Sequence, residues 1–109
     1  MLEPLLRSKN TERVLLFLVT REDGHARDIA RFFDTDLYAI QKQLDNLESG
    51  GVLVSRVAGR TRLYAFNPRY PFLKELKELL LKTLAFYPEE EREKLMMNRR
   101  RPRRRDKPL

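Results

Sequence analysis

The stretch from Asp34 to Gly51 places the tightest constraint on the fold, because it combines a helix start, an apolar stripe and a helix stop. Asp34, Thr35 or Asp36 can each accept a hydrogen bond from a free N–H group of the first helical turn. Apolar residues then recur at helical spacing, which predicts one buried stripe, and two glycines can end the helix. The opposite face would carry four polar side chains, those of Tyr38, Gln41, Lys42 and Asp45.

Two shorter segments before this stretch also have helical patterns. A first helix over about residues 10–20 would be capped by Asn10 or Thr11 and would bury its apolar side. Residues 21–26 then hold a polar turn and a very short strand, and a second helix covers about residues 27–33. The second and third helices are separated only by a tight polar turn, which predicts a helix-turn-helix arrangement.

The pattern changes after the double glycine. Residues 52–57 are rich in β-branched side chains, Gly59 lies in a turn, and residues 62–67 read as a second strand. Two strands around a short glycine-bearing turn form a hairpin. Pro68 and Pro71 end it, since proline cannot donate to a strand ladder or continue into a helix interior.

A long helix is expected from Phe72 to about Tyr87, followed after Pro88 by a short helix that starts with acidic residues. In the long helix, Leu73, Leu76, Leu80 and Leu84 form a continuous apolar stripe. Leu79, Leu81 and Phe86 widen this stripe. The predicted fold class is therefore mainly α with a small β-hairpin (α+β): helix, very short strand, two helices, hairpin, long helix and a C-terminal helical extension.

The net charge of the 109-residue chain is +7, but it is unevenly placed. Residues 99–109 contain six arginines and one lysine against one aspartate, a net of +6, which leaves only +1 for residues 1–98. We expect one folded domain over residues 1–98 and a basic, disordered tail over residues 99–109. No export signal or membrane-spanning stretch is evident, so a cytoplasmic protein without membrane contact is expected.

Catalytic and metal-binding patterns are absent from the sequence. The chain has one histidine, His25, and no cysteine, and a single histidine in a turn is far more often structural than catalytic. No phosphate-binding glycine loop or nucleophile motif occurs. We therefore expect no enzyme activity, no catalytic residue, no cofactor and no metal site.

The hairpin has a different character. Arg56, Arg60 and Arg62 flank its tip, and no acidic residue lies between Gly51 and Pro71. In a nearly neutral body this is a local cationic projection, and such arginines can contact phosphates or a minor groove. Exposed charge that only confers solubility is the alternative reading of the hairpin by itself. Its place directly after the helix-turn-helix favours the nucleic-acid interpretation.

The ordered set of segments resembles winged helix-turn-helix transcriptional regulators, and looks like the ArsR-like branch of that superfamily. The matching segments are H-A-R-D-I-A-R-F-F, A-I-Q-K-Q-L-D-N-L-E-S-G-G-V-L-V-S-R and G-R-T-R-L-Y-A-F-N-P. The leucine-rich continuation is similar to small winged-helix domains found beside nucleotidyltransferases. The resemblance covers roughly residues 10 to 84. It implies a homodimer that binds double-stranded DNA, whereas the missing cysteines put metal sensing in doubt.

By this resemblance the third helix enters the major groove and the hairpin is the wing. Groove-facing candidates are Thr35, Asp36, Leu37, Tyr38, Gln41 and Lys42. Gln41 could read adenine through two hydrogen bonds, and Lys42 could bind guanine or a phosphate. Asp36 could serve as a cap instead, and Asp45 is given no DNA contact. The wing would contact DNA through Arg56, Arg60 and Arg62, and the second helix would touch the flanking backbone through Arg27 and Arg31.

The leucine stripe exceeds what one small domain needs, and an exposed apolar patch of that length would favour aggregation. We therefore expect a two-fold dimer interface at Leu73, Leu76, Leu80 and Leu84. Two alternatives remain open from sequence. The domain could be an interaction module for another protein such as a nucleotidyltransferase, or a nonspecific nucleic-acid binder acting through the basic tail.

Overall fold

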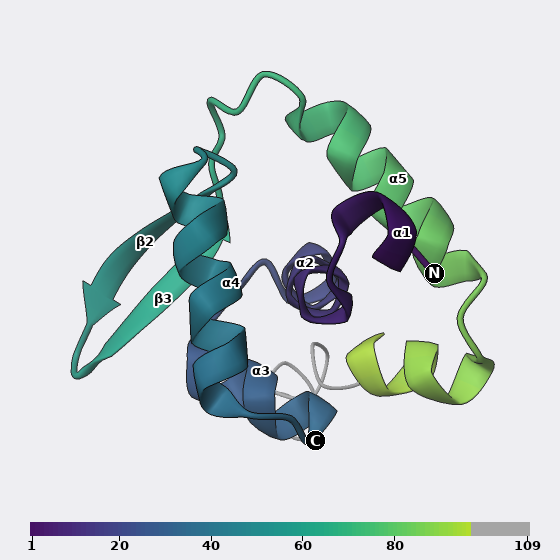
Figure 1. The fold of residues 1–109 in the computed structure, drawn as a ribbon, viewed down its shortest axis with the longest axis horizontal. Helices are drawn as coiled ribbons and strands as arrows, with labels where there is room; N and C mark the ends of the chain where they lie inside the picture. Colours follow the sequence, from purple (N-terminus) through teal and green to yellow (C-terminus); the bar gives the residue numbers. More distant parts are fainter. Residues whose placement is uncertain (97–109) are drawn as a thin grey trace, which may run out of the picture.

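A computed structural model of the chain describes residues 1–96 (Figure 1). Its helices are α1 (Glu3–Leu6), α2 (Lys9–Arg21), α3 (Ala26–Phe33), α4 (Leu37–Ser49) and α5 (Leu73–Ala85). Its strands are β1 (Asp23–Gly24), β2 (Leu53–Ala58) and β3 (Thr61–Phe66), and residues 89–96 are also helical. The predicted fold class and element order are confirmed, with α1 as an extra short helix. The tail predicted for residues 99–109 lies outside the described residues.

Helix α2 is the centre of the molecule. It is seen nearly end-on in the middle of Figure 1, with α1, α3, α4 and α5 arranged around it. Five consecutive side chains, residues 14–18, are each at most 2 % exposed, so α2 is covered on nearly every side. The sequence predicts that α2 buries only one side. The structure instead buries α2 on nearly all sides, as is usual for a helix in a protein interior.

Local capping explains where the helices begin. Ser8 Oγ accepts a hydrogen bond from the Thr11 N–H at 3.2 Å, so α2 starts slightly earlier than the predicted caps Asn10 or Thr11 would allow. His25 Nδ1 accepts from the Asp28 N–H at 3.4 Å and caps α3. The single histidine therefore has a structural role at this helix end.

The three strands form an antiparallel sheet in the order β1-β3-β2. In the hairpin, Leu53 pairs with Phe66, and Ala58 pairs with Thr61 next to the two-residue tip. Gly59, at the tip, has a φ of 66°, a left-handed conformation that favours glycine. This register fixes which side chains of the hairpin share a face, because paired residues point to the same side of a sheet.

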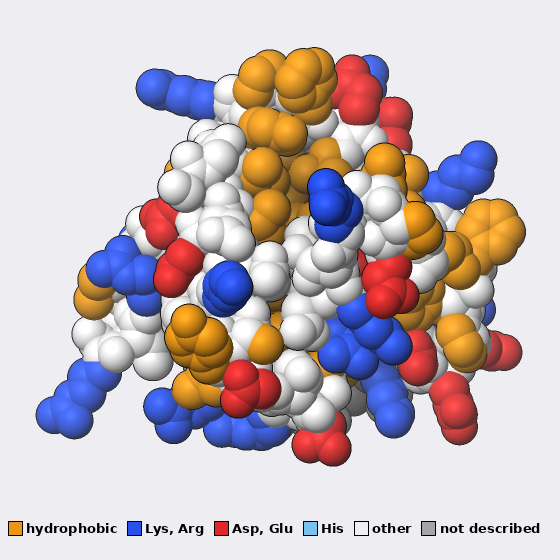
Figure 2. All heavy atoms as spheres, viewed as in Figure 1, with side chains coloured by type: hydrophobic (Ala, Val, Ile, Leu, Met, Phe, Trp, Pro, Cys, Tyr) orange, Lys and Arg blue, Asp and Glu red, His pale blue; other side chains and the backbone are white. Residues whose placement is uncertain are grey.

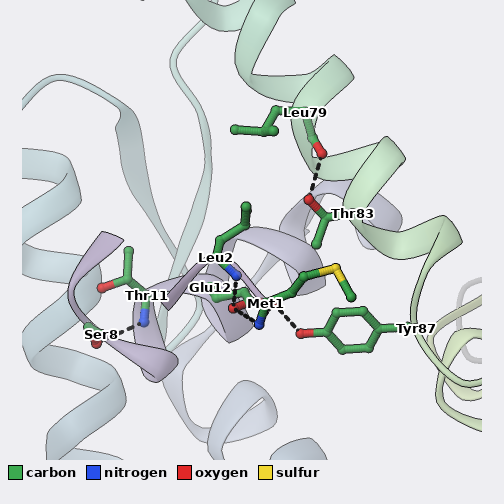
Figure 3. Close-up of polar contacts among 8 residues, drawn as sticks. All are labelled: Met1, Leu2, Ser8, Thr11, Glu12, Leu79, Thr83 and Tyr87. Atoms are coloured by element: carbon green, nitrogen blue, oxygen red, sulfur yellow. Dashed lines mark hydrogen bonds and ion pairs between the residues drawn. The ribbon is translucent and has the colours of Figure 1, made fainter. Parts of the chain in front are cut away.

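A buried carboxylate on α2 binds the N-terminus and the segment that follows α5 (Figure 3). Glu12 is 1 % exposed and accepts hydrogen bonds from the Met1 ammonium at 3.0 Å, the Leu2 N–H at 2.8 Å and the Tyr87 hydroxyl at 2.5 Å. Burial acts to raise the pKa of Glu12, but the hydrogen bonds outweigh it and the pKa lies below its ordinary value. Burial, together with the bond to Glu12, raises the pKa of Tyr87, so its hydroxyl stays a donor.

Within residues 1–96, no helix has both the length and the apolar composition that crossing a bilayer requires.

Candidate nucleic-acid interface

Helix α4 is fixed to the body through its inward side. Ile40 and Leu44 are both 0 % exposed, and Gln43 Oε1 accepts a hydrogen bond from Thr11 Oγ1 of α2 at 2.9 Å. Asp36 Oδ2 caps the helix by accepting from the Ala39 N–H at 3.0 Å. The role of Asp36 as a cap, one of the alternatives seen in the sequence, is therefore confirmed. The opposite side of this firmly seated helix faces solvent.

The solvent side of α4 carries part of the predicted reading surface. Tyr38 is 74 % exposed, Leu37 is 41 % exposed, and Lys42 is exposed one turn further along. Thr35 is half-buried just before the helix. The exposed stripe continues to Asn46, which sequence reasoning missed. Its position four residues after Lys42 is the signal that places it on the same face, and an amide there has the groups that read adenine.

Gln41 is hydrogen-bonded within the protein. Its Nε2 donates to Asp45 Oδ1 at 3.0 Å and to the Tyr64 hydroxyl at 2.9 Å, which uses both N–H bonds of the amide. Reading adenine through two hydrogen bonds needs one free donor as well as the carbonyl oxygen. Without DNA the side chain joins α4 to the wing, and adenine reading by Gln41, which would require one of these bonds to be released, stays a prediction.

Tyr64 lies at the centre of this contact between α4 and β3. Its hydroxyl accepts from Gln41 and donates to Asp45 Oδ1 at 3.4 Å. Burial raises the pKa of Tyr64, the charges of Asp45 and Glu48 raise it further, and the hydrogen bond from Gln41 only partly opposes them. The phenol therefore remains protonated as a donor.

The three wing arginines do not form one cluster. Arg60 is exposed at the tip, and Arg62 is on the face of the hairpin that α4 covers, where Nη1 donates to Ser55 Oγ at 3.0 Å. The register puts Arg56 on the other face, where its guanidinium lies 3.7 Å from the Asp23 carboxylate. Arg62 thus lies on the α4 side of the wing and Arg60 at its tip, whereas Arg56 lies on the opposite face, near Asp23 of β1.

Arg27 and Arg31 are both exposed on α3, one helical turn apart. Arg31 Nη1 lies 3.5 Å from Asp28 Oδ1, an exposed ion pair that leaves the guanidinium accessible. Figure 2 shows Lys and Arg side chains at the wing end and along the lower edge of the molecule. Helix α3 and the hairpin both pack against α4, so the exposed arginines of α3 and of the wing lie on elements next to it.

The predicted dimer residues on α5 are mostly engaged within the chain. Leu80 is 0 % and Leu84 is 5 % exposed, both in the core with α2, and Leu73 and Leu76 are partly buried against the same core. Leu80 and Leu84 are therefore corrected as interface residues, since buried side chains cannot meet a partner, whereas the partly buried Leu73 and Leu76 stay predictions. The exposed apolar residues of this region are Phe72, Leu79, Leu81 and Phe86.

The fold is that of a winged helix-turn-helix protein, with α3 and α4 as the helix-turn-helix and β2–β3 as the wing. No family model matches the chain, nor does any curated protein. Solved structures do match over most of its length. A mutant of ZitR from Lactococcus lactis, in its apo form, is 19 % identical with a TM-score of 0.55, covering 97 % of this chain and 89 % of its own.

Two further similar structures are those of transcriptional regulators. A mutant of MepR from Staphylococcus aureus, bound to an oligodeoxyribonucleotide, is 19 % identical with a TM-score of 0.53, over 97 % of this chain and 84 % of its own. A MarR-family transcriptional regulator from Rhodococcus sp. RHA1 is 18 % identical with a TM-score of 0.56, over 91 % and 76 %. At these identities the similarity shows the fold, and it lends no support to the ArsR-like branch in particular.

Proposed function

We propose that this protein is a cytoplasmic transcriptional regulator that binds double-stranded DNA sequence-specifically as a homodimer. The observation that carries the proposal is that α3 and the wing, which both pack against α4, bear exposed cations: Arg27 and Arg31 on α3, and Arg60 and Arg62 on the wing. Side chains on α4 would read base edges while the flanking cations bind phosphates. The DNA-bound MepR structure has the same fold.

The homodimer is part of this proposal, and its surface is the outward side of α5. Leu81 is 53 % and Phe86 is 66 % exposed, whereas the inward leucines are buried. A two-fold dimer would place its two α4 helices about 34 Å apart, one turn of DNA. The natural target is then an inverted repeat. Neither the ArsR-like resemblance nor an association with a nucleotidyltransferase is needed for this geometry.

The proposal is tested by selecting bound duplexes from a random pool and then competing them with unrelated duplex. We expect an enriched symmetric motif whose binding resists random competitor by a factor of about 10³ or more. The Tyr38→Ala and Lys42→Ala variants should relax the motif at defined positions. Parallel selection with a chain that ends at residue 98 separates the folded domain from the basic tail. Equal binding to all sequences, lost with the tail, would contradict the proposal.

The wing contact is tested by Arg60→Ala. We expect this substitution to weaken binding to every duplex by about the same factor, near tenfold, and to reduce the salt slope by about 1. The cause is the loss of one phosphate contact without the loss of any base contact. Arg69→Ala is the matched control, because Arg69 is also exposed but follows the opposite end of β3. Unchanged affinity and salt slope for Arg60→Ala would remove the wing from the interface.

A further inference from the structure

Between Gln41 and Glu48, α4 contacts the wing through polar side chains as well as through the shared apolar core. Ser55 and Tyr64 are directly paired across the hairpin, and Arg62 lies two residues before Tyr64, so all three point to the α4 side. Gln41 meets Tyr64 at 2.9 Å, and Glu48 meets Ser55 at 2.6 Å. Figure 1 shows α4 running alongside β2 and β3. Two polar links therefore join the helix to the wing.

The outer of these links bridges a helix carboxylate to a wing cation. The Ser55 hydroxyl donates to Glu48 Oε2 at 2.6 Å and accepts from Arg62 Nη1 at 3.0 Å. Because the short bond to the carboxylate fixes the hydroxyl hydrogen, the lone pairs of Ser55 Oγ are turned toward Arg62. The arginine is otherwise exposed, so this contact determines where its guanidinium lies.

We infer that Ser55, oriented by Glu48, is a positioning residue that places the Arg62 guanidinium beside the reading side of α4 before any ligand arrives. The DNA part of this inference rests on the proposed function. An exposed arginine that is already placed loses less conformational freedom when it binds a phosphate, which is worth roughly three- to tenfold in affinity. Arg60 at the tip has no side-chain hydrogen bond or ion pair within residues 1–96 and serves as the internal comparison.

A double-mutant cycle tests the positioning. Ser55→Ala should weaken duplex binding by roughly three- to tenfold although Ser55 itself contacts no DNA. In an Arg62→Ala background the same change should have no further effect, whereas in an Arg60→Ala background the two losses should multiply. Ser55→Thr keeps the hydroxyl and suits a strand, so it should bind as the wild type does. Equal loss from Ser55→Ala in all three backgrounds would overturn the inference.

A measurement on the free protein tests, without DNA, whether Ser55 holds the Arg62 side chain in place. In the free protein, the heteronuclear NOE of the Arg62 Nε–H group should report an ordered side chain, and that of Arg60 a mobile one. Ser55→Ala should make Arg62 as mobile as Arg60, while thermal unfolding confirms that the variant is folded. If Arg62 and Arg60 are equally mobile in the wild type, Ser55 does not position the arginine. If the wild type binds no duplex, the proposed function fails, but this readout still stands.

Discussion

Replacing Leu80 by alanine is expected to lower the free energy of unfolding by about 2–5 kcal/mol. Leu80 is 0 % exposed and belongs to the core cluster that surrounds α2. Its removal leaves a cavity that the helices cannot fully close. Urea unfolding followed by circular dichroism measures the loss, and an unchanged slope with denaturant would show that only stability has changed.

The neighbouring leucine is the matched control. Leu81 is 53 % exposed, so Leu81→Ala should change the free energy of unfolding of the isolated chain by about 0.5 kcal/mol or less. If the outward side of α5 forms the proposed dimer, Leu81→Lys should instead shift sedimentation toward the monomer at micromolar concentration. The opposite result, stability lost at Leu81 and association lost at Leu80, would mean that the two faces of α5 have been exchanged.

Glu12→Gln is expected to lower the free energy of unfolding at neutral pH by about 2 kcal/mol, because it weakens charge-assisted bonds to a buried acceptor. The lowered pKa of Glu12 also makes the contribution pH-dependent. The stability it provides is present above the ordinary pKa of 4.5 and is lost as the pH falls through the lower folded-state pKa. Chemical unfolding between pH 7 and pH 3 should therefore show a steeper acid loss in the wild type than in Glu12→Gln.

Tyr87→Phe is the milder companion to this change, since it removes one hydroxyl donor and keeps the aromatic ring. We expect a loss of about 1 kcal/mol with most of the acid dependence retained. If Glu12→Gln and the wild type lost stability in parallel from pH 7 to pH 3, protonation of the buried Glu12 carboxylate would not cause the acid-dependent loss of stability.

Apart from the extra helix α1, local signals in the sequence were sufficient for the order of elements. The turn at residues 21–24, the double glycine and the two prolines after the hairpin each act within a few residues of the feature they determine. The cap at Asp36 was among three candidates, and the structure distinguishes them because Asp34 takes a left-handed conformation, φ 53°, that ends α3. Such a choice depends on backbone angles that the residue type alone does not fix.

What could not be predicted depends on contacts between distant segments. Gln41 had the chemistry of a base reader, but its amide lies against Tyr64, 23 residues away, and only the hairpin register reveals that. The leucine stripe on α5 showed correctly that one face is apolar. Leu80 packs on its own chain because α2 has apolar surface on nearly all sides that other helices must bury. The periodicity of the α5 leucines does not reveal this requirement.

Helix α2 also determines how the chain behaves when it is incomplete. It contacts α1, α3, α4, α5, β1 and β3, and together these elements cover the run from Val14 to Leu18. A fragment that lacks one of the covering helices leaves part of a continuous apolar segment in water, where it can associate with other chains. Partial proteolysis of this protein should therefore yield insoluble material rather than smaller folded pieces.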